Sequence, residues 1–244
     1  MRDRDDDDDK QRAIYRERAD AYDRLVRAED VDGALGRALG ALLARNEPRG
    51  LRALDVGCGT GRVAGVLLSL GVAEVVGVER EPAMLAVAAR NHADAVARGA
   101  LRLIEGDARA LPLDDGDLPF DLAVAGWCFG HFRHWMPDGW RREIDLALDG
   151  LTRAVRPGGA LVVIETLGTG HATPRAHPAL DEYFEHLEAR GFSRRWLRTD
   201  YAFGSIDEAA EVLGAFFPAA LVAQIRHERW ARVPECTGIW SRPR

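Results

Sequence analysis

The sequence is poor in cysteine and lysine, and it has no long hydrophobic run. The three cysteines, Cys58, Cys128 and Cys236, lie far apart and form no CxxC pair, which argues against a disulfide framework or a structural zinc site. No stretch approaches the roughly 20 apolar residues of a membrane-spanning helix, and the acidic N-terminus does not resemble a signal peptide. These absences predict a reduced, cytoplasmic protein that needs no metal and does not enter a membrane.

Almost all basic residues are arginine, because Lys10 is the single lysine of the chain. It directly follows a run of five aspartates, residues 5–9. Blocks of like charge are usually disordered, so we expect residues 1–10 to be a disordered acidic tail or a tag remnant; an acidic interaction tail is the alternative. The chain carries 33 basic and 39 acidic residues, a net charge of −6, which gives it no overall attraction to nucleic acid.

Length and hydrophobic pattern predict one α/β domain. The 244 residues, of which 47% are hydrophobic, suffice for a single large core. Residues 11–48 have a helical period and are expected to form an N-terminal cover, and residues 49–244 are expected to form the main domain. There, strands alternate with helices, as in a mostly parallel sheet with right-handed crossovers. The predicted strands are residues 51–56, 73–79, 101–105, 120–125, 160–166 and, near the C-terminus, 230–241.

A glycine-rich loop follows the first predicted strand. Residues 54–62 read LDVGCGTGR, and Gly57, Gly59 and Gly61 allow positive φ angles and a close approach of a ligand to the backbone. In an open parallel sheet, such a loop lies at the carboxyl edge, where ligands bind. The dinucleotide fingerprint GxGxxG would require glycine at position 62. Because Arg62 occupies that position, a dinucleotide oxidoreductase is the less favoured interpretation.

Acidic residues follow the next two predicted strands. Glu79 ends the second strand, and its carboxylate can accept two hydrogen bonds from a ribose diol. Asp107 follows the third strand and can accept a hydrogen bond from an adenine amino group while the Ala108 N–H donates to the ring. A nucleoside held at both ends, without a cradle for pyrophosphate, indicates an adenosyl ligand with an amino acid tail.

Together these motifs resemble those of the class I S-adenosylmethionine-dependent methyltransferases. The matching segments are LDVGCGTGR at 54–62, VGVE at 76–79, EPAML at 81–85, GDA at 106–108, FDLAVA at 120–125 and LTRAVRPGG at 151–159. The resemblance covers about residues 50–166. It implies a Rossmann-like α/β fold, with a seven-stranded, mostly parallel sheet, helices on both faces and an antiparallel C-terminal strand.

The resemblance also implies which residues hold the cofactor, S-adenosyl-L-methionine, and its product S-adenosyl-L-homocysteine. These residues are Asp55, Gly57, Gly59, Glu79, Arg80, Met84, Asp107, Ala108 and Tyr22. In this scheme Asp55 and the glycine loop surround the methionine part, Glu79 holds the ribose, and Asp107 meets the adenine amino group. Met84 or Arg80 flanks the adenine, although simple helix packing is the alternative for Met84. No metal is expected.

The methyl acceptor is expected beyond the fourth strand, where residues 126–135 read GWCFGHFRHW. This stretch lacks the NPPY or DPPY pattern of nucleic-acid amino-methylating enzymes. Cys128 follows tryptophan instead of proline, so cytosine carbon methylation is not supported. Aromatic rings suit a sulfonium through cation–π contact, and they also suit a flat or apolar acceptor. The predicted substrate-pocket residues are Trp127, Phe129, His134 and Tyr15.

His131 is the candidate for acid–base catalysis, because histidine titrates near neutrality; a histidine that hydrogen-bonds the loop backbone is the alternative. Arg62 either faces the ligands or lies on the helix surface. We predict methyl transfer to an oxygen or nitrogen of a small molecule by in-line displacement, with no nucleic acid or membrane partner. The alternatives are an RNA or protein methyltransferase, for which the arginine-rich residues 190–198 are the best support, and a non-catalytic cofactor-binding subunit. The oligomeric state is left open.

Overall fold

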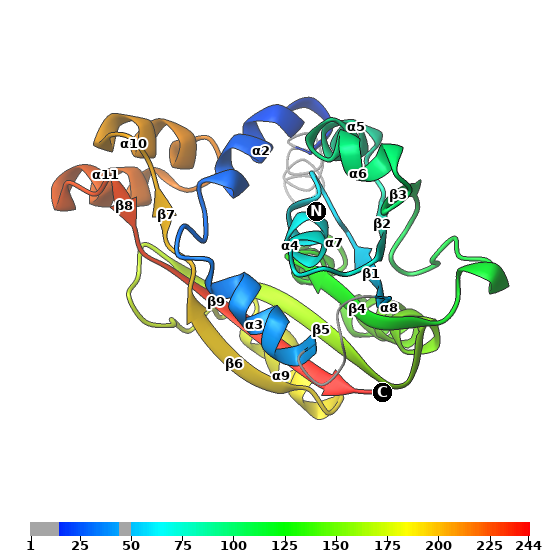
Figure 1. The fold of residues 1–244 in the computed structure, drawn as a ribbon. Coiled ribbons are helices and arrows are strands. Elements are labelled where there is room, and N and C mark those ends of the chain that lie inside the picture. The colour runs from blue at the N-terminus through cyan, green and yellow to red at the C-terminus, as the bar shows by residue number, and fades with distance from the viewer. Residues whose placement is uncertain (1–14, 44–49) are drawn as a thin grey trace.

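A seven-stranded sheet with the order β3-β2-β1-β4-β5-β9-β6 forms the centre of the fold (Figure 1). The structure is a computed structural model that describes residues 15–43 and 50–244; the predicted acidic tail, residues 1–10, lies outside them. The strands of this sheet are β1 (Arg52–Val56), β2 (Glu74–Glu79), β3 (Leu101–Glu105), β4 (Phe120–Gly126), β5 (Val155–Thr169), β6 (Ser193–Arg198) and β9 (Glu235–Pro243). A separate short ladder pairs β7 (Tyr201–Ala202) with β8 (Arg232–Val233).

Helices cover both faces of the sheet and one end of it. They are α2 (Ala19–Arg27), α3 (Ala34–Leu43), α4 (Arg62–Ser69), α5 (Pro82–Asn91), α6 (Ala93–Ala97), α7 (Gly130–Trp135), α8 (Trp140–Ala154), α9 (Asp181–Ala189), α10 (Ile206–Gly214) and α11 (Ala219–Glu228). Successive strand residues point to opposite faces. Leu54 and Val56 therefore join the core with α8 and α9, whereas Ala53 joins the core with α3 and α4.

The strand directions confirm the fold class that the sequence predicts. Strands β1 to β5 are parallel, and β9 is antiparallel to both β5 and β6. β1 and β4 are buried along nearly their whole length, as expected for parallel strands with helices on both faces. This order brings the carboxyl ends of β1, β2 and β4 side by side, with the end of β5 next to β4.

Two elements differ from the sequence prediction. The helix expected over residues 81–98 is interrupted at His92, which leaves the helical conformation at φ −123° and ψ 32° while its Nε2 lies 2.9 Å from the Gly61 carbonyl oxygen. The last strand, expected over residues 230–241, is divided into β8 and β9 at Pro234. Proline has no N–H group for a strand ladder, so it ends the first segment.

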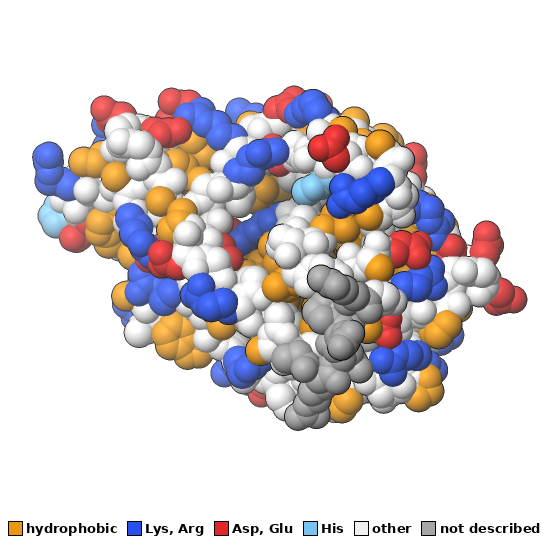
Figure 2. Space-filling view, in the orientation of Figure 1, with side chains coloured by type: hydrophobic (Ala, Val, Ile, Leu, Met, Phe, Trp, Pro, Cys, Tyr) orange, Lys and Arg blue, Asp and Glu red, His pale blue; other side chains and the backbone are white. Residues whose placement is uncertain are grey.

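A helical lobe lies over the carboxyl end of the sheet. It consists of α2, α10 and α11, which pack around Leu25, Tyr201, Leu213 and Ile225. Figure 2 shows acidic and basic side chains alternating along the edge formed by α10, α2 and α5. Ion pairs also join α2 to α10, because the Arg24 guanidinium binds Glu208 at 3.1 Å and Glu211 at 2.9 Å. The division into a cover at 11–48 and a domain at 49–244 stays a prediction.

Candidate active site

The glycine loop between β1 and α4 has the backbone that its sequence predicts. Gly57, Gly59 and Gly61 have φ angles of 67°, 54° and 88°, a region that side chains with a Cβ atom rarely occupy. Gly57 is also confined by space, because a Cβ atom there would overlap Cys128 Sγ and lie 2.8 Å from Cys128 Cβ. The loop therefore packs directly against the end of β4, with its backbone facing the cavity described below.

Glu79 at the end of β2 bridges this loop to the start of α5. Its Oε2 accepts the Gly59 N–H at 3.0 Å, and its Oε1 accepts the N–H groups of Arg80 at 2.7 Å and Glu81 at 2.9 Å. Burial raises the pKa of the carboxyl group above its ordinary value, and the three N–H donors oppose that shift. A carboxylate has about four lone-pair positions, so Oε2 retains an acceptor position for a ligand hydroxyl.

Asp55 on β1 has one oxygen with a partner and one without. Oδ2 accepts the Ala64 N–H at 2.9 Å, whereas Oδ1 is buried and has no hydrogen-bond partner. Burial raises the pKa of this carboxyl group to about 7. Asp55 lines a small cavity beneath the glycine loop together with Tyr22 and Arg62. Asp55 Oδ1 is thus a buried acceptor that lacks a donor, and the ammonium group of a methionine tail could supply one.

The predicted adenine end is formed by α5 and by the turn after β3. Met84 is 2% exposed and packs against Ala19 and Tyr22 of the helical lobe. The Asp107 carboxylate is held by Arg109, whose Nε and Nη2 donate to it at 2.8 and 2.6 Å. This guanidinium lowers the pKa of Asp107. An adenine amino group would therefore share the Asp107 oxygens with Arg109, which the sequence analysis does not anticipate.

A cavity of about 790 Å³ gathers most of the predicted cofactor residues. Among the residues that line it are Tyr15, Tyr22, Gly57, Gly59, Glu79, Arg80, Met84, Asp107, Ala108, Trp127 and His131. The backbone cradle, the Glu79 acceptor and the partnerless Asp55 oxygen in the adjoining cavity fit an adenosyl group with an amino acid tail. Within the described part of the chain, no group of three His, Cys, Asp or Glu residues could hold a metal ion.

His131 lies on the wall of this cavity, on the first turn of α7. Its Nε2 is 3.1 Å from the Tyr15 hydroxyl oxygen, and its ring stacks on Trp135 with the centroids 4.8 Å apart. Burial, and then the neighbouring His134, lower the pKa of the imidazole to about 4. His131 is therefore neutral at pH 7 and less basic than the free side chain assumed from the sequence.

The other aromatic residues after β4 take different positions. Trp127 has a φ of 50°, uncommon for a bulky residue, and the Arg62 guanidinium stacks over its ring at 4.2 Å. Phe129, predicted for the substrate pocket, is instead fully buried and stacks with Phe132 at a centroid distance of 6.0 Å, because the chain turns into α7 at Gly130. His134 lines a second cavity.

The second cavity, of about 1230 Å³, shares Tyr15, Tyr22, Trp127 and His131 with the first. Its remaining wall includes Glu29, Arg62, Glu165, Thr166, Tyr201, Phe216 and Glu235. The three glutamates of this wall are not among the residues predicted from the sequence. For Glu165 a signal was available, because it is the one charged residue in the apolar run 160–166 that forms the centre of β5.

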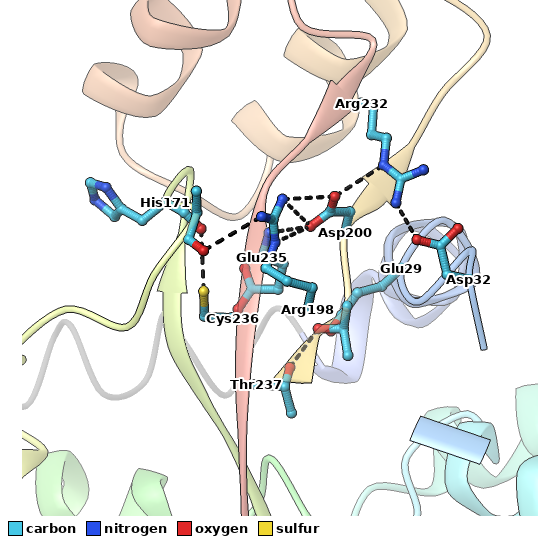
Figure 3. A network of polar contacts seen from close by, with 11 residues as sticks. Glu29, Asp32, His171, Arg198, Asp200, Arg232, Glu235, Cys236 and Thr237 are labelled. Carbon is cyan, nitrogen blue, oxygen red and sulfur yellow. Dashed lines mark hydrogen bonds and ion pairs between the residues drawn. The ribbon is translucent and has the colours of Figure 1, made fainter. Parts of the chain in front are cut away.

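A polar network includes Glu29 and Glu235 of this wall, and Figure 3 shows part of it. Glu29 pairs with Arg62 at 2.7 Å and accepts the Thr199 hydroxyl at 3.1 Å. Nearby, Asp200 binds Arg198 at 2.8 Å and Arg232 at 3.0 Å. The network ties the loop after α2 to the segment between β6 and β7, and it fixes the position of Arg62 at the start of α4.

Comparison with known proteins agrees with this geometry. Residues 54–163 match the family described as "Methyltransferase domain". A demethylmenaquinone methyltransferase of Thermus thermophilus is 36% identical over 154 residues, which cover 62% of this chain and 64% of that protein. A malonyl-[acyl-carrier protein] O-methyltransferase of Pseudescherichia vulneris is 32% identical over 176 residues, covering 71% and 62%. The chain thus spans less than two thirds of the length of these curated relatives.

Solved structures share the fold at low sequence identity. The [4+2]-cyclase SpnF has a TM-score of 0.53 at 24% identity, with 86% of this chain and 82% of that chain covered. An S-adenosylmethionine-dependent methyltransferase from Geobacter sulfurreducens, solved with S-adenosyl-L-homocysteine, has a TM-score of 0.50 at 20% identity and covers 86% and 90%. The glycine loop and the sheet order agree with these matches: residues 54–163 are similar to a methyltransferase domain, and the chain shares the fold of S-adenosylmethionine-dependent methyltransferases.

Proposed function

We propose that this protein transfers the methyl group of S-adenosylmethionine to an oxygen or nitrogen atom of a small molecule by in-line displacement. One observation carries the proposal: a cavity lined by the glycine loop, Glu79 and Asp107 adjoins a second cavity large enough for an acceptor, and both share His131 and Trp127. The similarity to a demethylmenaquinone methyltransferase and to a malonyl-[acyl-carrier protein] O-methyltransferase supports methyl transfer as the reaction class.

Each part of the cofactor is assigned to residues of the first cavity or of the small cavity beneath the glycine loop. Asp55 Oδ1 receives the ammonium group of the methionine part, the loop backbone at Gly57 and Gly59 lies against it, and Glu79 Oε2 accepts a ribose hydroxyl. Met84 provides an apolar surface for the adenine, and Asp107 accepts a hydrogen bond from the adenine amino group. The bound cofactor supplies an electrophilic methyl group on a sulfonium.

The residues around the acceptor mainly exclude water and fix orientation. Rates rise steeply when reacting atoms are held about 3 Å apart in line. The Trp127, Tyr15 and His131 rings form the shared wall between the two cavities, so they limit both the approach and the solvation of the acceptor. A neutral His131 can accept the proton of an acceptor hydroxyl, and a carboxylate acceptor needs no such base.

An RNA or protein substrate is less well supported than a small molecule. The arginine-rich residues 190–198 suggested from the sequence form the end of α9 and β6, and several of their cations already bind acidic neighbours. Arg190 pairs with Asp145 at 2.9 Å, and Arg198 pairs with Asp200 at 2.8 Å. Paired cations attract a phosphate backbone less than free ones do. No helix within residues 15–43 and 50–244 has the length and hydrophobicity to cross a membrane.

Calorimetry tests the cofactor. S-adenosylmethionine or S-adenosyl-L-homocysteine is expected to bind in the micromolar range, roughly −7 to −8 kcal/mol, and NAD is expected not to compete. Saturable competition by NAD would contradict the assignment.

A labelling assay tests the acceptor. The protein is incubated with methyl-tritiated S-adenosylmethionine and a cell extract, which is then separated into small molecules, RNA and protein. Label is expected in the small-molecule fraction. Label in RNA or protein would support those alternatives, and tight cofactor binding without any transfer would support a non-catalytic subunit.

A further inference from the structure

Asp107, which lines the first cavity, belongs to a charged network that extends away from that cavity. Arg109 and Glu143 are not among the residues that line it. The Arg109 guanidinium nevertheless joins two carboxylates, because its Nη2 lies 2.6 Å from Asp107 and its Nη1 lies 3.0 Å from Glu143. Arg109 and Glu143 can therefore act on a ligand in the cavity through Asp107, without touching the ligand themselves.

A tight turn after β3 brings Arg109 back to Asp107. The Ala110 N–H donates to the Asp107 carbonyl oxygen at 3.0 Å and closes the turn. Within the turn, Asp107 Oδ1 accepts the Arg109 backbone N–H at 2.9 Å, a bond that aspartate side chains often make to the backbone two residues on. The turn thus holds the carboxylate at one point, and the paired Nε and Nη2 donors of Arg109 hold it at two more.

These three bonds leave one oxygen of Asp107 with an open acceptor position. Oδ1 accepts the Arg109 backbone N–H and Nε, whereas Oδ2 accepts Nη2 alone. A carboxylate has about four lone-pair positions, two on each oxygen, so Oδ1 is saturated and Oδ2 can accept one more bond. The Arg109 guanidinium also lowers the pKa of Asp107, so Oδ2 is an acceptor at neutral pH. A two-pronged arginine contact fixes direction as well as charge, so this open position is oriented.

Glu143 on α8 holds Arg109 from the other side. Its Oε2 accepts the Arg109 Nη1 at 3.0 Å, which leaves the edge formed by Nε and Nη2 for Asp107. The guanidinium also lies over the ring of Phe132 on α7, 5.7 Å from its centroid, and Phe132 lines the first cavity. The side chains of Asp107, Arg109 and Glu143 are 31%, 26% and 20% exposed. The network therefore ties the turn after β3 to two helices at the predicted adenine end.

We propose that Arg109 and Glu143 are positioning residues that aim Asp107 Oδ2 at the cofactor base, so that the site selects a purine with an amino group. The adenine amino group supplies the hydrogen that the open position of Oδ2 accepts, and a base without this group leaves that charged oxygen unpaired. The inference rests on the proposed function, because it takes Asp107 as the residue that meets the adenine.

The test compares S-adenosyl-L-homocysteine with its 6-deamino analogue, in which hydrogen replaces the amino group of the base. The analogue keeps the neighbouring ring nitrogen, which can still accept the Ala108 N–H, so the two ligands differ only in the group assigned to Asp107. Their dissociation constants are measured by calorimetry at pH 7 on the full chain. The wild type is expected to bind S-adenosyl-L-homocysteine at least about tenfold more tightly, as for the loss of one hydrogen bond to a charged acceptor.

Two variants address the network without touching the cavity wall. Arg109→Gln removes the paired donors and the charge, and we expect the preference for the amino group to fall to about threefold or less. Glu143→Met, with a side chain of similar length and helix propensity, removes only the support behind Arg109 and should reduce the preference at least about twofold. Affinity for the 6-deamino analogue should stay at the wild-type value in both variants.

Arg102→Gln is the matched control. Arg102 on β3 also pairs with an aspartate, Asp117, and neither residue lines the first cavity, so this variant should keep the wild-type preference. Should Arg109→Gln fail to fold, Glu143→Met decides, because it retains the contacts between Arg109 and Asp107.

The outcomes separate this inference from the proposed function. If S-adenosyl-L-homocysteine binds and the wild type shows no preference over the 6-deamino analogue, the inference is overturned and the methyltransferase proposal stands. A preference that stays the same or rises in Arg109→Gln would mean that Arg109 competes with the base for Asp107, and an equal loss of both ligands would assign Arg109 to the stability of the cavity; either result overturns the inference. If neither ligand binds the wild type, the proposed function fails and the inference fails with it.

Discussion

Replacing Glu79 by alanine tests the bridge between the glycine loop and the cofactor. The substitution removes the acceptor for the N–H groups of Gly59, Arg80 and Glu81, as well as the oxygen assigned to the ribose. A hydrogen bond to a charged group contributes about 1.5–3 kcal/mol, but the three N–H donors regain part of this from water. We therefore expect the free energy of unfolding to fall by roughly 1–3 kcal/mol and cofactor affinity to fall at least about tenfold, or 1.4 kcal/mol.

The assay measures S-adenosyl-L-homocysteine affinity by calorimetry and stability by urea unfolding on the same preparation. Glu105→Ala is the matched control, because Glu105 pairs with Glu79 in the register of β2 and β3 and its side chain is exposed. That variant should match the wild type in both measurements. A folded Glu79→Ala protein that retains wild-type affinity would refute the assignment of Glu79 to the ribose, whatever its stability.

Three further substitutions are informative. Gly57→Ala should unfold the protein or lower its stability by about 2–4 kcal/mol, because the residue has a left-handed φ and a Cβ atom would overlap Cys128. Gly139→Ala should be tolerated, because the space around Gly139 is open. Equal denaturation midpoints for the two variants would contradict this prediction. His131→Ala should lower kcat by about 10²-fold and leave cofactor affinity unchanged. This loss is at the low end of the range for a general base, because the basicity of His131 is reduced. An unaltered kcat would exclude His131 from catalysis. Burial raises the pKa of Glu165 from 4.5 to about 7, so its folded form binds the proton more tightly and Glu165 should contribute a fall in stability of roughly 3 kcal/mol between pH 4.5 and 7. The fall measured for Glu165→Gln should be smaller than that of the wild type by this amount, and parallel pH curves would refute the prediction.

The cofactor side of the site could be predicted from the sequence because its residues lie in short, contiguous motifs. Gly57 to Gly61 and Glu79 each follow a strand whose apolar run is visible, and neighbouring parallel strands bring their carboxyl ends to one edge. Asp107 was also located correctly at this edge, on the wall of the first cavity. The bidentate bond between Asp107 and Arg109 could not be predicted, because a spacing of two residues in the sequence does not determine whether the two side chains point toward each other.

The acceptor side was less predictable for a physical reason. Glu29, Glu165 and Glu235 belong to the loop after α2, to β5 and to β9, and they line one cavity because β9 inserts in antiparallel fashion between β5 and β6. Phe129 is predicted for the pocket as part of the aromatic stretch 126–135 that follows β4. The backbone is left-handed at Trp127 and turns into α7 at Gly130, and Phe129 is buried in the core.

Arg62 connects the two halves of the site. It follows the last glycine of the loop, stacks over the Trp127 ring at 4.2 Å and pairs with Glu29 of the helical lobe at 2.7 Å. Removing one partner of a largely buried ion pair leaves the other charge uncompensated, so the position of Glu29 on the acceptor wall and the conformation of the glycine loop depend on each other. The acceptor wall is in turn anchored to β9 through Thr199 and Thr237, whose hydroxyl oxygens lie 2.6 Å apart. The second cavity is therefore lined largely by the lobe, β5 and β9, and the first cavity by residues at the ends of β1 to β4. Arg62 contacts Trp127, which lines both cavities, and Glu29, which lines the second.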